Sequence, residues 1–382
     1  MDTASQRDGG LPEAVLRAAG RIGEVGSAYD ADLLLSTLIG GVYQALPPDR
    51  GPALDAFVDT LREHLASSTD PNAPLVAAAL DGRSQTVRAT GGYAYGDRYG
   101  DQTSYLATFA YDEPERGGPE HAVVVLADHN AGLAEDVLVL APAGPVLDQL
   151  RSSLLTDPDA MTWLTEVPLA TVRTAAHAYL RATDLAAQLP ASEGLPANRW
   201  LALSRLALLP EPADEPEPAA PAADRNIAEE FLAAPEAALA GLAGSGGSRG
   251  ESVNYCLGLI VDFATSRGGD PLRWSPQSVT TFLTDWIHQR AVLDNVDVAT
   301  LPGTLAAWVV WAGRRLDLPD HAVQSTFRQV NADRDEFVRL YATGERRSPA
   351  AEAMARLVAE GVDLTDEAAV DAWLRAYNAE HG

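Results

Sequence analysis

The sequence predicts a mostly helical protein in two domains: an α+β N-terminal domain with a small antiparallel β-meander, followed by an all-α helical C-terminal domain. A stretch rich in proline and acidic residues, 210–224, divides the chain. Short runs of β-forming residues occur before this stretch, and apolar residues at helical spacing fill the chain after it. We therefore expect domains at 1–209 and 225–382, joined by an extended acidic linker at 210–224.

The N-terminal domain is expected to begin with helices and then to change to strands. Leucine and valine recur at helical spacing in residues 30–46 and 52–67. Three later segments either alternate or form short apolar runs between turn signals, which predicts three antiparallel strands. These strand segments are 105–111, 121–127 and 137–140. Helices are expected to follow at 146–155, 160–166, 169–189 and 199–209.

The C-terminal domain is expected to be helical throughout. A short helical segment at 227–242 is interrupted near Pro235, and apolar stripes then recur to the end of the chain. Ser275 and Pro276 form a favourable N-cap and first-turn pair, and Thr365 is expected to cap the last helix. Trp308 and Trp311 lie three residues apart, so they either pack in the core or form an exposed aromatic surface for a partner.

The composition excludes several mechanistic classes. The chain has no lysine, so all 28 basic residues are arginine. Schiff-base enzymes, P-loop nucleotide enzymes and protein kinases in their usual forms all need a lysine. The single cysteine, Cys256, cannot form an intrachain disulfide, a cysteine-rich zinc site or an iron–sulfur cluster, and its apolar helical surroundings predict a core residue.

The charge and the hydropathy pattern limit the partners. The formal net charge is −26, and the two domains and the linker are each acidic. A surface that binds phosphate would work against this field, so we do not expect nucleic acid as a direct partner. No run approaches 18 apolar residues and the N-terminus lacks an apolar signal-peptide core, so we expect no membrane span and a cytoplasmic protein.

Residues 121–136 contain the first candidate site. Asp128 and His129 follow a predicted buried strand, and Asp136 lies where the next strand begins. Two carboxylates and an imidazole on one short connection could bind a divalent metal or perform acid–base chemistry. The alternative is an ordinary hairpin, because Asp, His, Asn and Gly favour turns by bonding nearby backbone.

Residues 91–101 contain the second candidate site. Glycines and tyrosines alternate there with charged residues, and Tyr95, Asp97, Arg98 and Asp101 could bind a small ligand, with arginine as the anion anchor. No strand–GxGxxG–helix context surrounds the segment, so it is not a dinucleotide fingerprint. The alternative is an irregular glycine-rich loop whose tyrosines pack on the sheet. If the two segments converge in space, together they would form a better pocket than either alone.

Part of the chain resembles proteins of one bacterial group. RWSPQSVTTFLTDWI (273–287), LPGTLAAWVVWAGRRLDLP (301–319) and GVDLTDEAAVDAWLRAYN (361–378) resemble a C-terminal module of an actinobacterial protein family whose activity is uncharacterised. EHAVVVLADHNAGLAEDVLV (120–139) is similar to a segment of the same kind of protein. The resemblance covers about half of the chain and implies a cytoplasmic actinobacterial protein. It supplies no catalytic residues.

Two classes of function remain open from the sequence. The first is an interaction or adaptor protein with two tethered domains, favoured by the aromatic-rich helical domain and by the lack of a complete catalytic constellation. The second is a metal-assisted hydrolase or small-ligand-binding protein that uses the loop with Asp128, His129 and Asp136. Only this second hypothesis needs a cofactor, a divalent metal ion.

Overall fold

The structure is a computed structural model that describes residues 21–46, 51–83, 86–156, 160–211, 227–266, 269–362 and 366–381. The chain divides into two compact units, Met1–Glu217 and Pro218–Gly382. This division falls inside the predicted linker 210–224. Most of the linker lies outside the described residues, and so does Thr365. The domain limits at 209 and 225 and the cap at Thr365 therefore stay predictions.

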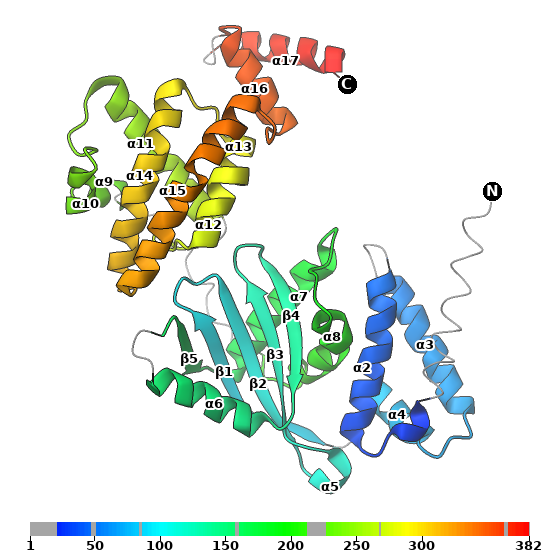
Figure 1. Cartoon of the computed structure of the whole chain (residues 1–382). Coiled ribbons are helices and arrows are strands. Elements are labelled where there is room, and N and C mark those ends of the chain that lie inside the picture. Colours follow the sequence, from blue (N-terminus) through cyan, green and yellow to red (C-terminus); the bar gives the residue numbers. More distant parts are fainter. Residues whose placement is uncertain are drawn as a thin grey trace. The chain divides into compact units, whose positions relative to one another are not determined.

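The N-terminal unit begins with helical elements that share one core (Figure 1). Ser27 starts the first long helix, because its hydroxyl accepts a hydrogen bond of 3.1 Å from the backbone N–H of Asp30. The apolar stripes predicted for 30–46 and 52–67 pack against each other. The elements are η1 (Ile22–Glu24), α2 (Ala28–Ala45), α3 (Gly51–Ser67) and α4 (Ala73–Leu80), the last of which was not predicted.

An antiparallel sheet forms the middle of this unit, and within the described residues it has five strands in the order β4-β3-β2-β1-β5. The predicted meander is confirmed and gains one strand, because β1 precedes the three expected strands as a further hairpin partner. The strands are β1 (Val87–Asp97), β2 (Gln102–Tyr111), β3 (His121–Asp128), β4 (Leu133–Leu140) and β5 (Thr162–Glu166). The short α5 (Pro114–Gly117) follows β2, and β5 joins the free edge of β1 after α6 (Ala143–Thr156).

The predictions for two segments are wrong. Residues 91–101, whose alternative interpretation is an irregular glycine-rich loop, consist mostly of β1, where small residues allow close packing. A Cβ added at Gly92 would lie only 2.7 Å from the carbonyl oxygen of Val167. Residues 160–166, expected as helix, contain β5. A short apolar run can form either a helix or a strand, and here the pairing with β1 makes it a strand.

Helices α7 (Leu169–Leu185) and α8 (Gly194–Leu206) pack on one face of the sheet (Figure 1). Their apolar side chains meet Ala107, Val125 and Val137 in a buried layer. Helix α8 also packs on α2, and a Cβ added at Gly40 of α2 would lie 2.0 Å from the carbonyl oxygen of Pro196. The two helix backbones therefore touch at this glycine.

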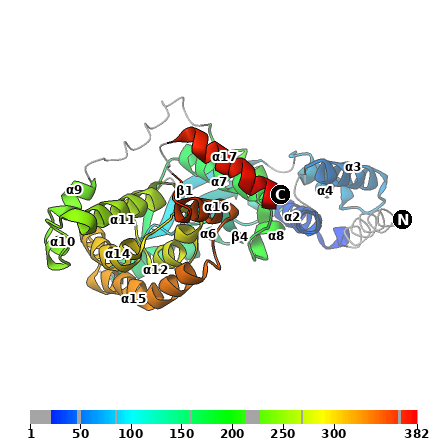
Figure 2. The ribbon, with the colours of Figure 1, turned by 90° about the horizontal axis from the view of Figure 1, so that it is seen from above.

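The C-terminal unit is helical in its described residues, as predicted. Ser275 forms the expected N-cap, with a reciprocal capping box to Ser278. Helices α11, α12, α14 and α15 lie side by side (Figure 2). The elements are α9 (Ile227–Leu232), α10 (Pro235–Leu239), α11 (Gly247–Ser266), α12 (Pro276–Thr281), the π-helix η2 (Phe282–Trp286), α13 (Ile287–Arg290), α14 (Asn295–Arg315), α15 (Asp320–Thr343), α16 (Pro349–Ala359) and α17 (Glu367–His381).

Aromatic side chains fill the core of this helical unit. Trp308 is fully buried and Trp311 is 6% exposed, and both pack on Phe231. The alternative of an exposed aromatic surface at these two tryptophans is therefore wrong, whereas the prediction that Cys256 is a core residue is confirmed. Among the described residues, α14 alone has the length and apolar composition to cross a membrane, but 61% of that stretch is buried within the protein, as in the core helix of a bundle.

Candidate functional site

The two segments singled out in the sequence meet at one end of the sheet. The β1–β2 turn and the β3–β4 turn lie side by side there, because β2 and β3 pair along their length. The backbone N–H of His129 donates to the carbonyl oxygen of Asp101 at 2.8 Å, and the Asn130 side-chain amide donates to the Asp101 carboxylate at 2.9 Å. The two segments therefore lie together in space.

The residues of the second candidate site have local structural roles. The carboxylate of Asp97 accepts hydrogen bonds from the backbone N–H groups of Asp101, at 3.2 Å, and Gln102, at 2.6 Å, which closes the β1–β2 turn. The backbone N–H of Arg98 donates to the carbonyl oxygen of Met161 at 2.8 Å and so ties this turn to the start of β5. Tyr95 lies within β1.

Asp128 and His129 also bond to the surrounding protein. One carboxylate oxygen of Asp128 accepts from the backbone N–H of Asn130 at 2.7 Å and of Ala131 at 3.0 Å, as in an ordinary Asx turn. The ring Nδ1 of His129 lies 2.6 Å from the Tyr179 hydroxyl, and Nε2 lies 2.8 Å from the Thr103 hydroxyl. Both nitrogens are thus engaged between the sheet and α7, and a metal ion would have to displace one of these hydroxyls.

Asp136 bonds to a different element. Its carboxylate accepts a hydrogen bond of 2.5 Å from the Ser192 hydroxyl, which itself accepts from the backbone N–H of Leu195 at the start of α8. The carboxylate therefore supports a helix terminus. Among the described residues there is no group of three or more His, Cys, Asp or Glu side chains placed to hold a metal ion.

No family model, curated protein or solved structure matches the chain.

A buried polar network that the sequence analysis missed joins α2, the sheet and α8. Arg205, 4% exposed, donates to the Asp32 carboxylate at 2.5 Å, to the Tyr111 hydroxyl at 2.8 Å and to Nε2 of His121 at 3.0 Å. Burial, together with the neighbouring guanidinium, lowers the pKa of His121 to about 4, so the ring is neutral near pH 7. The bonds are mutually satisfied and closed to solvent, so the network stabilises the packing of α8.

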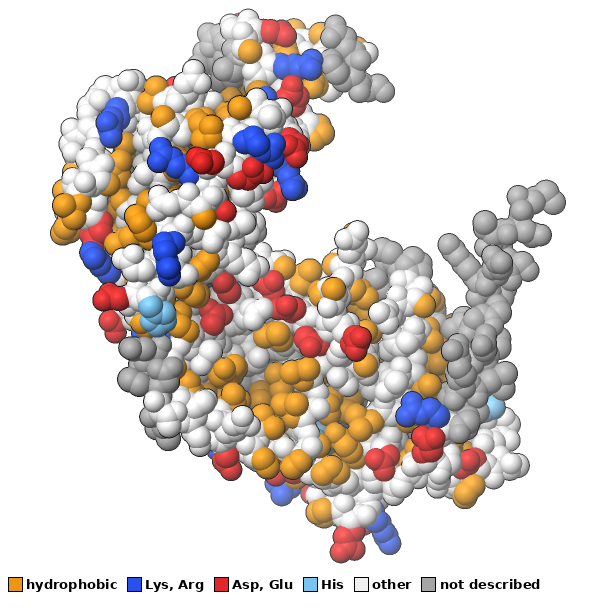
Figure 3. Space-filling view, viewed as in Figure 1, with side chains coloured by type: hydrophobic (Ala, Val, Ile, Leu, Met, Phe, Trp, Pro, Cys, Tyr) orange, Lys and Arg blue, Asp and Glu red, His pale blue; other side chains and the backbone are white. Residues whose placement is uncertain are grey.

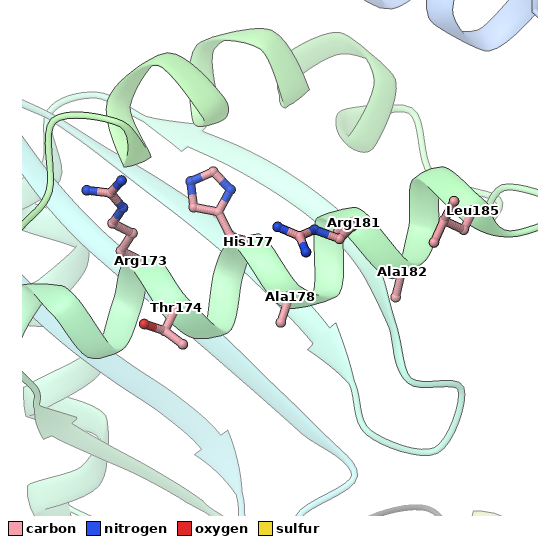
Figure 4. Close-up of a pocket in the computed structure, with 7 residues that line it drawn as sticks. All are labelled: Arg173, Thr174, His177, Ala178, Arg181, Ala182 and Leu185. Atoms are coloured by element: carbon pink, nitrogen blue, oxygen red, sulfur yellow. The ribbon is translucent and has the colours of Figure 1, made fainter. Parts of the chain in front are cut away.

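A groove along α7 is the second feature that the sequence analysis missed (Figure 4). Arg173, His177 and Arg181 point to one side of the helix in this view, and Leu185 lies at its end. Arg173 already donates to the carbonyl oxygen of Leu209 and bonds the Glu211 carboxylate at 3.2 Å. Burial and the two arginines lower the pKa of His177. The described lining residues all belong to α7 and include no carboxylate, so they do not provide the usual pair for acid–base catalysis.

The face of the sheet opposite α7 and α8 carries partly exposed apolar side chains. Register places one row of side chains across it: Leu164 of β5, Tyr95 of β1, Ser104 of β2, Leu126 of β3 and, on the edge strand β4, Asp136. All five are partly exposed, and Leu138 of β4, in the next row, is 39% exposed. Figure 3 shows hydrophobic side chains gathered over these strands. We call Tyr95, Leu126, Leu138 and Leu164 the open apolar face.

Helix α6 covers the other end of this same face. Its Ala143 and Leu147 bury Leu106 and Val124, and the guanidinium of Arg151 lies 5.5 Å from the centre of the Tyr93 ring. A solvated face of an antiparallel sheet normally carries polar side chains. The open apolar face departs from this rule. Within β1 Gly92 packs toward α7 and Gly96 against Trp163 of β5, while the tyrosines point outward. This alternation is visible in the sequence of residues 92–96 once it is taken as a strand.

Proposed function

We propose that this chain is an interaction protein whose N-terminal unit binds a segment of another protein on the open apolar face. The observation that carries the proposal is the row of Leu164, Tyr95 and Leu126, which stays partly exposed on a sheet whose other face is packed. Apolar side chains exposed together on one face of a folded protein are typical of an interaction site. We also propose a cytoplasmic location, with neither nucleic acid nor membrane as a partner.

The chemistry of the open apolar face fits a protein partner better than a reaction. Tyrosine is enriched in the centres of protein interfaces, because its ring supplies contact area while its hydroxyl remains able to bond. The carboxylates at the turn end of the face, those of Asp97 and Asp128, hold their own turns. The metal-assisted alternative would require His129 to give up a hydroxyl partner that it already has.

Selection from a random library of 16-residue peptides on the full-length chain tests the proposal. We expect enriched peptides whose binding weakens at least tenfold with Leu138→Gln or Leu126→Gln, because each change places an amide where an apolar contact is needed. Leu185→Gln is the matched control, since this residue is 80% exposed on α7 and lies on the other side of the sheet.

Circular dichroism and hydrogen exchange in β3 would verify that the variants fold. Leu138→Gln is the safer substitution because its site is already exposed. The proposal is overturned if the folded variants bind every enriched peptide as tightly as the parent chain. Dependence on Leu185 instead would transfer the binding site to the α7 groove.

A further inference from the structure

We propose that the occupant of the open apolar face is a segment of another protein that carries arginine or lysine beside its apolar residues. This inference rests on the proposed function and adds the chemical class of the partner. It follows from the charges that border the face at the end of the sheet where the two candidate segments meet.

Three carboxylates border the face at that end. Asp97 lies two residues beyond Tyr95 in β1, and Asp128 lies two residues beyond Leu126 in β3. Glu135 joins them through the side-chain amide of Gln102, which donates to its carboxylate. We call Asp97, Asp128 and Glu135 the acidic rim, and Figure 3 shows acidic side chains gathered near this end of the sheet.

The acidic rim lacks cationic partners within the described residues. No arginine there forms an ion pair with Asp97, Asp128 or Glu135, in contrast to Asp81 and Asp184, which are both paired. Partial burial and the nearby carboxylates of Asp128 and Asp136 raise the pKa of Glu135, so its negative charge is held at a cost. A cation from a partner would relieve this repulsion.

The spacing between the face and the acidic rim sets the pattern of the partner. Two residues of an extended strand span about 7 Å, so a cation is needed about 7 Å from the apolar contact. A partner helix provides this separation when an arginine lies one turn, about 5.4 Å, from a leucine. The length of the arginine side chain covers the rest of the ~7 Å.

Charge disfavours the other occupants. A second copy of this chain also carries a net charge of −26, so self-association would work against strong mutual repulsion. The phosphate backbone of a nucleic acid would be repelled in the same way. A basic and apolar protein segment matches both the face and its border.

Two synthetic 18-residue helical peptides test the inference on the full-length chain. Both peptides carry the same leucine stripe. The first has arginines one helical turn from the stripe, and the second has glutamates at the same positions. We expect fluorescence anisotropy to show at least tenfold tighter binding of the arginine peptide. We expect Asp128→Asn with Glu135→Gln to weaken that binding about threefold to tenfold, since exposed ion pairs contribute modestly.

A charge-matched control separates the acidic rim from the overall field. Asp55→Asn with Glu63→Gln removes two exposed acids of α3 and should leave the affinity within about twofold of the parent. Both rim substitutions keep an oxygen acceptor for the existing bonds, so the sheet should remain folded.

The outcomes distinguish the inference from the proposed function. If both peptides bind equally and Leu138→Gln abolishes their binding, the proposal of a basic partner is overturned. The proposal that this face binds a protein segment is then retained. Equal loss in the rim pair and the control pair would also overturn it. A dimer in analytical ultracentrifugation that Leu138→Gln dissociates would assign the face to a second copy. Failure of both peptides and of all library peptides would overturn both proposals.

Discussion

Replacement of Arg205 by methionine tests whether the buried polar network stabilises the N-terminal unit. Methionine keeps an apolar stem of similar length but removes every donor of the guanidinium. Asp32, 6% exposed, would keep the Tyr111 hydroxyl, 3.1 Å away, as its remaining side-chain donor. His121 would lose the donor at its Nε2 atom while staying fully buried.

The expected loss follows from these unpaired groups. Removing one partner of a buried ion pair costs about 3–5 kcal/mol, because the remaining charge stays in a poorly solvated place. The orphaned imidazole nitrogen adds about 1 kcal/mol. We therefore expect Arg205→Met to lower the free energy of unfolding of this unit by about 4–6 kcal/mol. Adding Asp32→Asn should recover about 1–3 kcal/mol, because no buried charge then remains unpaired.

Hydrogen exchange of the full-length chain, followed by mass spectrometry of its peptides, measures this loss within one unit. Protection in β3 and α8 should fall about a thousandfold to twenty-thousandfold in Arg205→Met, since each 1.4 kcal/mol changes an equilibrium about tenfold. Peptides from α14 and α15 serve as the internal control and should keep their protection. A loss below about 1 kcal/mol, or a double variant less stable than Arg205→Met, would refute the reasoning.

The remaining predictions concern packing and pH. Gly40→Ala should lower thermal stability by about 1–3 kcal/mol, because its Cβ would collide with the backbone of Pro196, whereas Gly41→Ala, with nothing within 4 Å of its Cβ, should not destabilise the protein. His121 stays neutral in the folded chain down to about pH 4 but takes up a proton near its ordinary pKa of 6.5 when unfolded. The N-terminal unit should therefore lose about 3 kcal/mol as pH falls from about 6.5 to 4, and His121→Gln, read by hydrogen exchange across this range, should flatten that slope. Trp308→Ala should cost about 3–5 kcal/mol in denaturant unfolding of the helical unit, and a loss below 1 kcal/mol would contradict its place in the core.

Much of the fold could be predicted because it rests on neighbouring residues. Helical spacing predicts α2 and α3 from their own stripes, and the runs at 105–111 and 121–127 predict β2 and β3. Strands β1 and β5 could not be recognised in this way. The glycines of β1 suggest a loop until the approach of α7 explains Gly92 and that of Trp163 explains Gly96, and β5 is a strand because β1 lies beside it.

The candidate site divides in the same way. The turn role of Asp128 follows from residues two and three positions away, so the local sequence already predicts the ordinary hairpin turn that fits these bonds. The partners of His129 lie 26 and 50 residues away, at Thr103 and Tyr179, and no local pattern predicts them. The buried position of Arg205 likewise depends on groups contributed by α2, β2 and β3.

The sequence by itself determined which chemistries are impossible, where most helices lie and which turns close the hairpins. These properties depend on residue types and on bonds between near neighbours. The tertiary structure decided that Trp308 lies in a core, that the two candidate segments meet at Asp101, and that Tyr95 and Leu126 share an uncovered face. For the sheet the physical reason is strand register: a shift of one residue turns every side chain to the opposite face, and register is set by distant parts of the chain. For Trp308 the reason is packing against Phe231, which lies far away in the sequence.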